Sequence, residues 1–223
     1  MTPEEHILET WQQNAAPWVK AIAGGEIESR LLVTNQAILQ TVLSLAPTRV
    51  WDIGCGEGWL CRSLAANGIN CTGTDAIPTL VDAANEKGGG RFEVLAYDAI
   101  TTEKASNIGA ELFLFNFSLF GAEQVLELLQ KLQPALPANG HLVIQTLHPF
   151  AAVGDALYES GWREGSWLGF SQDFVNPAPW YFRTVGDWVK MLVKAGFRLI
   201  HLKEPVHPKT GKPASLILVA KGG

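Results

Sequence analysis

The residues best suited to chemistry lie in the segment VWDIGCGEGWL, residues 50–60, where an acidic side chain and three glycines follow an apolar run. Asp52 comes first, and Gly54, Gly56 and Gly58 follow on alternate positions. Glycine loses more backbone entropy on folding than any other residue, so three in one loop indicate a close approach to a bound group. A loop that opens a helix also presents free N–H groups, which favour a negatively charged ligand.

Two further acidic positions follow the next two apolar runs. Asp75 ends the run Gly-Thr-Asp and lies 21 residues after Gly54, where a carboxylate can accept both hydroxyls of a ribose. Tyr97, Asp98 and Ala99 end the third run, and an acceptor side chain there can take the amino group of an adenine. Together these residues predict a pocket for an adenosine that carries a polar tail.

The elements that must position these residues are short apolar runs that alternate with helical stretches. The predicted strands span residues 50–53, 69–73, 92–96, 112–117 and 142–146. Strands alternating with helices indicate βαβ units and a parallel sheet. After a helix over residues 185–194, runs at 197–202 and 214–220 flank a turn rich in Pro and Gly, which predicts an antiparallel hairpin that closes the sheet.

Two helices are predicted before the first strand. The first opens with a capping box, Thr2 to Glu5, and shows apolar residues at helical spacing, with a break expected near Pro17. The second follows Gly24 and Gly25. We therefore expect an N-terminal helical cap over residues 1–46 and an α/β domain over 47–223, in which residues 149–182 form an insert without clear periodicity.

Two ligand classes compete for the glycine loop. A nicotinamide dinucleotide favours the pattern G-x-G-x-x-G, but Trp59 stands where the third glycine belongs, and no tyrosine is followed by lysine at the fourth position as in short-chain reductases. The motif DIGCGEG instead closely resembles the first motif of class I S-adenosylmethionine-dependent methyltransferases. Asp75 and Tyr97-Asp98 match the second and third motifs, and LQPALPANGHLVIQ and AGF match later signatures. The resemblance covers residues 47–148 and 184–220.

This resemblance implies a doubly wound, mostly parallel, seven-stranded, Rossmann-like sheet with the C-terminal hairpin and the helical cap. It implies S-adenosylmethionine as cofactor, S-adenosylhomocysteine as product, and methyl transfer to the oxygen, nitrogen or carbon of a small-molecule acceptor, with no metal required. The expected cofactor contacts are Arg30, Asp52, Gly54, Cys55, Gly56, Gly58, Asp75, Ala76, Ile77, Tyr97, Asp98, Ala99, Asn116 and Phe117. Arg30 would reach the methionine carboxylate, although an ion pair with Glu26 explains it equally well.

The insert is the strongest candidate for acceptor binding. It holds nine of the 21 aromatic residues, namely Phe150, Tyr158, Trp162, Trp167, Phe170, Phe174, Trp180, Tyr181 and Phe182. This density suits a lid over a flat or apolar acceptor, and equally a small satellite core. Trp11 and Trp18 from the first helix, with Tyr181 and Arg183, are the predicted substrate contacts. His148, just past the fifth strand, is the predicted catalytic base, or equally a histidine that hydrogen-bonds the loop.

Charge and composition narrow the partners. Lys and Arg number 9 against 20 Asp and Glu before residue 183, and 8 against 2 from there on, without the interleaved aromatic residues of a nucleic-acid platform. No apolar run approaches membrane-spanning length, and three cysteines without a C-x-x-C pair suit a reducing cytoplasm. We expect a cytoplasmic monomer or homodimer without nucleic-acid or membrane partners. The alternatives are a non-catalytic S-adenosylmethionine-binding protein and an NAD-binding oxidoreductase.

Overall fold

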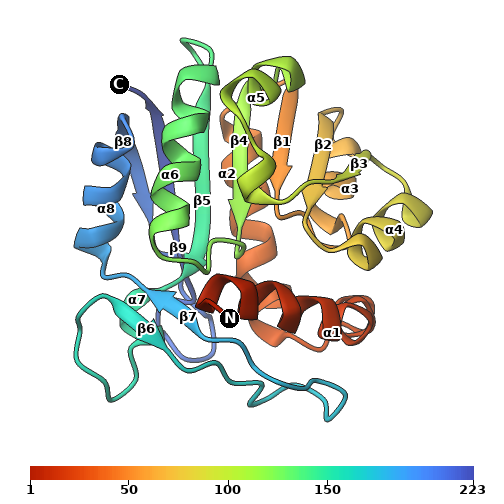
Figure 1. Cartoon of the computed structure of the whole chain (residues 1–223), viewed down its shortest axis with the longest axis vertical. Helices are drawn as coiled ribbons and strands as arrows, with labels where there is room; N and C mark the ends of the chain where they lie inside the picture. Colours follow the sequence, from red (N-terminus) through yellow and green to blue (C-terminus); the bar gives the residue numbers. More distant parts are fainter.

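The sheet expected from the alternating runs is present in the computed structural model, which describes residues 1–223 (Figure 1). Its strand order is β3-β2-β1-β4-β5-β9-β8. The strands are β1 (Arg49–Ile53), β2 (Asn70–Asp75), β3 (Arg91–Val94), β4 (Leu112–Asn116), β5 (His141–Leu147), β8 (Phe197–Lys203) and β9 (Ser215–Gly222). Strands β1 to β5 pair in parallel, and β9 runs antiparallel between β5 and β8. The predicted seven-stranded sheet with its terminal hairpin is confirmed.

Helices cover both faces of the sheet and enclose two apolar cores. One core packs α2 (Asn35–Ser44), α3 (Trp59–Ala65) and α4 (Pro78–Lys87) against the sheet. The other packs α5 (Thr102–Ile108), α6 (Glu123–Leu132) and α8 (Val185–Lys194) against the opposite face. Short turns of π-helix (η1, Arg30–Thr34) and 3-10 helix (η2, Tyr97–Ala99; η3, Gln133–Ala135) connect these elements. This burial on both faces explains why the strands read as continuous apolar runs.

The first helix, α1 (Pro3–Gly24), is continuous, so the break expected near Pro17 was wrong. Pro17 removes one backbone hydrogen bond, but both ends of the helix are capped, by the Thr2 capping box and by Gly25 in the left-handed conformation. The buried side of α1 also packs against α4 around Ala15 and Leu80. These contacts offset the missing bond, and α1 crosses the end of the sheet as one rod (Figure 1).

The two N-terminal helices occupy different places. Ile38 and Val42 of α2 are fully buried in the core under the sheet, beside α3. Only α1 lies across the carboxyl ends of β1, β2 and β4 (Figure 1). The predicted boundary at residue 46 stays a prediction. Of the two helices before it, only α1 covers the carboxyl edge of the sheet.

The insert contains more regular structure than its sequence indicates. It forms α7 (Pro149–Ala152) and a two-stranded antiparallel sheet of β6 (Gly161–Arg163) and β7 (Trp180–Phe182). Its remaining residues run beneath α1 in Figure 1. Strands of three residues give too little hydrogen bonding to be stable alone, so the insert depends on contacts with the rest of the chain.

Those contacts come mainly from α1. The fully buried Asn14 donates from Nδ2 to the Val175 carbonyl oxygen and accepts from the Val175 N–H at Oδ1, both at 2.8 Å. Thr10 donates to the Asn176 carbonyl oxygen at 2.9 Å. An aromatic cluster continues the contact, and its members are Trp11, Trp18, Phe120, Trp167, Phe170 and Phe174. The helix and the insert therefore form one covering layer.

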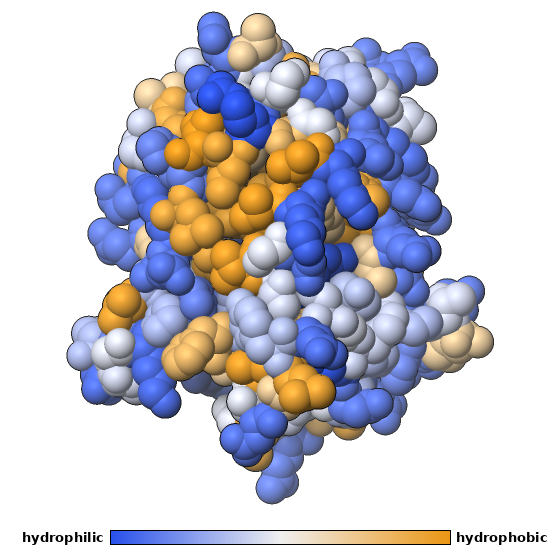
Figure 2. Space-filling view, turned by 90° about the vertical axis from the view of Figure 1, so that its left-hand side faces the viewer, coloured by the Kyte–Doolittle hydropathy of each residue, from blue (hydrophilic) through white to orange (hydrophobic).

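A different surface lies away from this layer. The side of the molecule that carries the β8 edge and α8 gathers apolar side chains into a patch (Figure 2). Leu202 of β8 and Val193 of α8 are exposed. No helix in the structure combines the length and the apolar character needed to cross a bilayer.

The Asn14 contact generates a prediction about local stability. We expect Asn14→Ala to raise the hydrogen-exchange rates of amides in residues 170–178 by roughly 10–100-fold, since it leaves the Val175 N–H without an acceptor. The Val175 carbonyl oxygen loses one of its two donors and keeps the Trp167 indole N–H. Gln12→Ala, on the exposed side of the same helix, is the matched control. Mass-spectrometric exchange checks this, and equal protection in all three proteins would show that Asn14 does not hold the insert.

Candidate active site

The three glycines of the loop after β1 each adopt a positive φ, of 82° at Gly54, 56° at Gly56 and 80° at Gly58. A β-carbon at Gly54 would lie 2.4 Å from the Ser118 β-carbon, and one at Gly58 would lie 2.7 Å from the Phe92 ring. At Gly56 the nearest atom would be the Trp18 indole nitrogen, 3.7 Å away. Packing thus requires glycine at residues 54 and 58, whereas a β-carbon at Gly56 would make only an ordinary contact with Trp18 of α1.

Asp75, at the end of β2, is tied to this loop. Its two oxygens accept hydrogen bonds from the Gly56 N–H at 2.9 Å and the Ile77 N–H at 3.0 Å. The Gly54 and Cys55 N–H groups donate to the Thr74 carbonyl oxygen at 2.7 and 3.0 Å. Desolvation by burial raises the pKa of Asp75. An ionised carboxylate has about four acceptor sites, so Asp75 keeps capacity for further hydroxyl donors.

Asp52 lies beneath the loop and is almost fully buried. Burial, with the nearby charge of Asp75 as the second cause, raises the pKa of Asp52 to about 7. Its Oδ2 lies 3.8 Å from the Cys61 sulfur, and its Oδ1 has no hydrogen-bond partner. Burial also raises the pKa of the Cys55 thiol, which therefore stays protonated and unreactive.

Tyr97, Asp98 and Ala99 lie in the 3-10 turn after β3 rather than in the strand, which ends at Val94. Tyr97 donates from its hydroxyl to the Ser118 carbonyl oxygen at 3.0 Å, so its ring braces the loop after β4. Asp98 and Ala99 are exposed at the same end of the sheet. The structure therefore brings the third predicted motif beside the first.

The end of β4 is conformationally strained. Phe117 adopts a φ of 55°, which is uncommon for a bulky residue and occurs most often at functional sites. Its N–H donates to the Gln145 carbonyl oxygen at 2.8 Å, and the preceding Asn116 accepts from the Gln145 side chain at 2.8 Å. These bonds hold both predicted residues at the carboxyl edge, next to the glycine loop.

Arg30 lies above the loop. Its guanidinium stacks over the rings of Trp18 and Trp59, at 5.6 and 5.0 Å from their centroids. It forms no ion pair with Glu26, and its buried Nη2 has no hydrogen-bond partner. Burial lowers the pKa of Arg30 to about 10, while the charge of Glu57 opposes that shift. A desolvated cation without a bonded anion is costly, which makes this position suited to a carboxylate.

Three residues of this region were missed by the sequence analysis. Glu57 is buried in the loop and binds Arg62 at 2.6 Å and Lys87, so it fixes the loop to α3 and α4. Ser118 donates to the Ile53 carbonyl oxygen at 2.8 Å. Trp59, read only as a missing glycine, forms one wall for Arg30. The one signal in the sequence for any of these three residues was the presence of an acidic residue, Glu57, within the glycine motif.

The predicted substrate residues Tyr181 and Arg183 lie under the insert, at the ends of β4 and β5. They line a small cavity of about 20 Å³ together with Phe117, Leu119, Phe120, Thr146, Leu147, Pro149, Ala152, Trp180, Phe182 and Trp188. Arg183 is buried and donates from Nη2 to the Gly121 and Ala122 carbonyl oxygens at 2.7 and 2.6 Å. Phe117 belongs to both this cavity and the edge beside the glycine loop, so the two regions are contiguous.

His148 begins α7, one residue past the end of β5. Its Nδ1 accepts the Phe150 N–H at 3.2 Å, and its Nε2 lies 2.8 Å from a carboxylate oxygen of Glu204. An Nδ1 that accepts places the proton on Nε2, which then donates to Glu204. Both ring nitrogens are engaged, and the side chain is buried.

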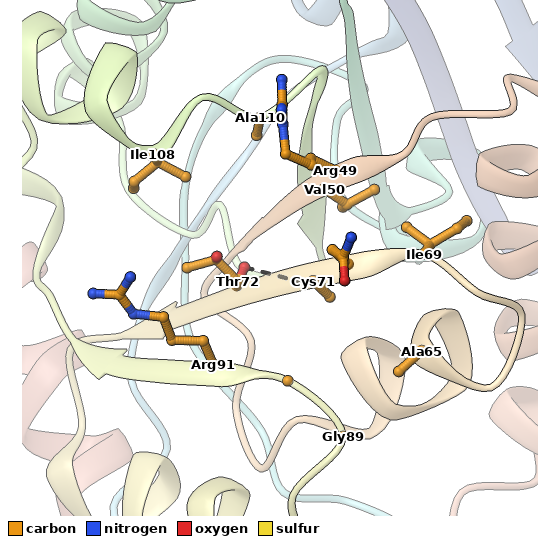
Figure 3. A pocket seen from close by; sticks show the side chains of 12 residues that line it. Arg49, Val50, Ala65, Ile69, Cys71, Thr72, Gly89, Arg91, Ile108 and Ala110 are labelled. Atoms are coloured by element: carbon orange, nitrogen blue, oxygen red, sulfur yellow. Dashed lines mark hydrogen bonds between the residues drawn. The ribbon is translucent and has the colours of Figure 1, made fainter.

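A second cavity, of about 440 Å³, lies at the opposite, amino-terminal edge of the sheet (Figure 3). Its charged residues are Arg49 and Arg91, whose guanidinium groups point away from each other in Figure 3. Each lies close to a glutamate, Glu111 at 3.6 Å and Glu93 at 2.5 Å. The cavity is large, but its charged side chains do not point toward a common ligand position. Ligands of open α/β sheets also bind at the other edge, so we do not assign a site here.

Several known proteins are similar to this chain. Residues 28–202 match a family model described as a methyltransferase domain. The chain is 27% identical to an uncharacterized methyltransferase of Schizosaccharomyces pombe over 164 residues, 70% of this chain and 62% of that protein. It is 27% identical to the ubiquinone biosynthesis O-methyltransferase of Histophilus somni over 156 residues, 66% and 65% of the two chains. The chain thus spans less than two thirds of either relative.

The fold is also similar to solved structures. An S-adenosylmethionine-dependent methyltransferase from Mesorhizobium loti superposes with a TM-score of 0.63, at 23% identity, over 82% of this chain and 95% of that one. At this identity the likeness shows the fold alone.

The buried Asp52 predicts a pH dependence of stability. The native state keeps the Asp52 proton up to a pH of about 7, whereas the unfolded carboxyl loses it near 3.8. Between these values the native state binds more protons, so the free energy of unfolding falls as the pH rises. We expect the ligand-free chain to lose about 1 kcal/mol between pH 6 and 8 relative to Asp52→Asn.

Denaturant titrations at several pH values measure this difference. Asp82→Asn, at an exposed position of α4, is the matched control and should keep the slope of the unchanged chain. Parallel pH profiles for the unchanged chain and Asp52→Asn would show that Asp52 is ionised throughout.

Proposed function

The chain belongs to the methyltransferase domain family, and on that premise we propose that it transfers a methyl group from S-adenosylmethionine to a small-molecule acceptor. The family expected from the DIGCGEG motif is thereby confirmed. The observation that carries the proposal is the glycine loop, held by Asp75 through the Gly56 N–H, with the unpaired Arg30 guanidinium above it. This arrangement offers acceptors for a ribose and a cation for a carboxylate at one edge of the sheet.

The side chains present fit this cofactor. Asp75 has acceptor sites left for the two ribose hydroxyls, and exposed Asp98 offers an acceptor to the adenine amino group. Arg30 Nη2 lacks a partner that a methionine carboxylate supplies. Gly56 leaves room, because a β-carbon there would find no atom nearer than 3.7 Å. We propose the remaining predicted contacts, Cys55, Ala76, Asn116 and Phe117 among them, as the walls of the same pocket.

When bound, S-adenosylmethionine supplies an activated methyl group, which passes to a lone pair of the acceptor as the carbon–sulfur bond breaks and its electron pair stays on sulfur. The chain's own contribution is alignment and exclusion of water. Trp18 and Trp11 of α1, packed edge to face at 5.1 Å, cover the glycine loop together with the insert. A covered apolar site of this kind suits a small acceptor rather than a polymer.

Two other proposals depend on separate observations. The three cysteines are all free and buried, which supports a reducing compartment, and we propose the cytoplasm. A dinucleotide-dependent oxidoreductase is disfavoured, because Trp59 opens α3 where a third glycine would allow the pyrophosphate to approach. A non-catalytic cofactor-binding role is separated from catalysis by an assay of acceptor-dependent methyl transfer.

For His148 the geometry supports the loop-holding role better than that of a base. Its two nitrogens are engaged by the Phe150 N–H and by Glu204, so the ring offers no free lone pair. We propose that His148 caps α7 and links it to the end of β8.

The cofactor proposal predicts how two variants respond to two ligands. Arg30→Gln should weaken S-adenosylhomocysteine binding roughly 10–100-fold, as for the loss of a hydrogen bond between charged groups, but leave methylthioadenosine binding nearly unchanged, because that ligand lacks the carboxylate. Asp75→Asn should weaken both, because both carry the ribose. Isothermal calorimetry measures all four affinities.

Arg62→Gln, which alters a neighbouring arginine bound to Glu57, is the control and should not distinguish the two ligands. Equal losses for both ligands in Arg30→Gln would remove Arg30 from the carboxylate. Tight binding of NAD by the unchanged chain, with none of S-adenosylhomocysteine, would overturn the proposed function.

The loop-holding role of His148 is tested by His148→Asn. Asparagine keeps an acceptor for the Phe150 N–H but loses the ring that reaches Glu204, so we expect kcat within about tenfold and a loss of roughly 1 kcal/mol in stability. Turnover and thermal unfolding are the measurements. A fall in kcat of roughly 10²–10⁴, with unchanged cofactor affinity, would instead assign the proton transfer to His148.

A further inference from the structure

Arg183 is the most heavily buried arginine that the structure leaves without an ion pair near the site. Its side chain stacks over the rings of Tyr181 and Trp188, with the guanidinium carbon 4.8 and 5.1 Å from their centroids. Nη2 is satisfied by the Gly121 and Ala122 carbonyl oxygens, but the buried Nη1 has no partner. The residue lines the cavity under the insert.

Asp187, the carboxylate whose charge acts on Arg183, does not pair with this cation. Asp187 accepts hydrogen bonds from Ser160 and Thr184 and pairs with Lys190 at 3.3 Å. Burial lowers the pKa of Arg183 to about 10, as it does for Arg30. Two desolvated arginines thus lie near the carboxyl edge of the sheet, each with one unsatisfied nitrogen. A buried, unpaired cation is expensive to keep unless an anion meets it.

The proposed cofactor carries one carboxylate, which Arg30 would take. Arg183 lines the cavity under the insert, whereas Arg30 stacks over Trp18 and Trp59, outside that cavity. A carboxylate bound by Arg30 therefore does not account for Arg183. The unpaired Arg183 guanidinium therefore indicates a second anion, separate from the cofactor carboxylate.

Resting on the proposed function, we propose that the methyl acceptor is a flat, largely apolar molecule with an anionic group, and that Arg183 binds that group through Nη1. The rings around the guanidinium set the rest of the acceptor's chemistry. Trp180, Tyr181, Phe182 and Trp188 offer apolar faces, and polar lining residues other than Arg183 are few. Such a surface excludes small hydrophilic acids and favours an aromatic body.

The cavity as it stands, about 20 Å³, holds no more than a water molecule, so the acceptor enters as the insert moves. The construction of the insert allows this. The β6–β7 pair has three residues in each strand, and Leu157 and Leu168 are strongly exposed. Movement of this segment opens the cavity toward Phe117 without disturbing the seven-stranded sheet.

The test compares two probes of the same shape and different charge, 2-naphthoate and 2-naphthamide. Their dissociation constants are measured by calorimetry on the full chain, with and without saturating S-adenosylhomocysteine. We expect the carboxylate to bind at least tenfold more tightly than the amide, since a charge-assisted bond to guanidinium is roughly twice as strong as a neutral one. This comparison needs no substitution and so does not depend on the folding of a variant.

Arg183→Lys then assigns the discrimination. Lysine can still donate to the Gly121 and Ala122 carbonyl oxygens but lacks the second nitrogen, so the preference for naphthoate should fall below about threefold. Arg163→Lys, a neighbouring arginine that stacks over Phe182 and binds exposed carbonyl oxygens, is the matched control and should keep the preference.

Each outcome decides the proposal. Equal affinities for the two probes, no binding of either, or a preference that persists in Arg183→Lys would overturn it. The proposed function is tested separately, by the binding of S-adenosylhomocysteine. Failure of S-adenosylhomocysteine to bind, together with a retained naphthoate preference, would remove the cofactor but leave the anion site, whereas the reverse result removes only the anion site.

Discussion

The close approach of the segments that follow β1 and β4 is the constraint on which the rest of the site depends. The strand order changes direction at this pair, because β1 connects onward to β2 on one side while β4 lies on the other. At such a switch point, the connections leave toward opposite faces and open a crevice above the strand ends. Here the crevice is narrowed until Gly54 touches Ser118, whose backbone carbonyl receives the Tyr97 hydroxyl. A side chain at residue 54 would collide with Ser118 and Tyr97, and would force apart the segments that follow β1, β3 and β4.

Much of the architecture was predictable from the sequence, because burial on both sheet faces imposes long apolar runs whose boundaries are turn residues. The α8 helix and the terminal hairpin follow such signals closely. The site was predictable to the extent that it uses backbone: positive φ values demand glycine, and an acid after a strand has few structural explanations. Roles that depend on contacts with residues distant in the chain could not be predicted from the sequence. Nothing in the sequence indicates that Glu57 is buried, yet its ion pairs with Arg62 and Lys87 make it a buried anchor of the loop.

The insert shows a second limit of sequence reading. Its aromatic residues have no helical or strand period, since the surface against which they pack is α1, some 160 residues away in the chain. The continuity of α1 through Pro17 has the same origin. Local propensity favours a break, but contacts with α4 and the insert favour a single rod, and the tertiary contacts outweigh one missing hydrogen bond.

The bond between Asn14 and Val175 joins residues 161 positions apart, which has a consequence for biosynthesis. During translation α1 emerges first, yet the residues that satisfy its buried asparagine are made only after five strands of the sheet have been synthesised. Contacts between such distant residues form late, because the entropy of closing the intervening loop must be overcome first. The first five strands can therefore assemble before α1 meets the insert, and the covering layer is completed only after the insert has been made.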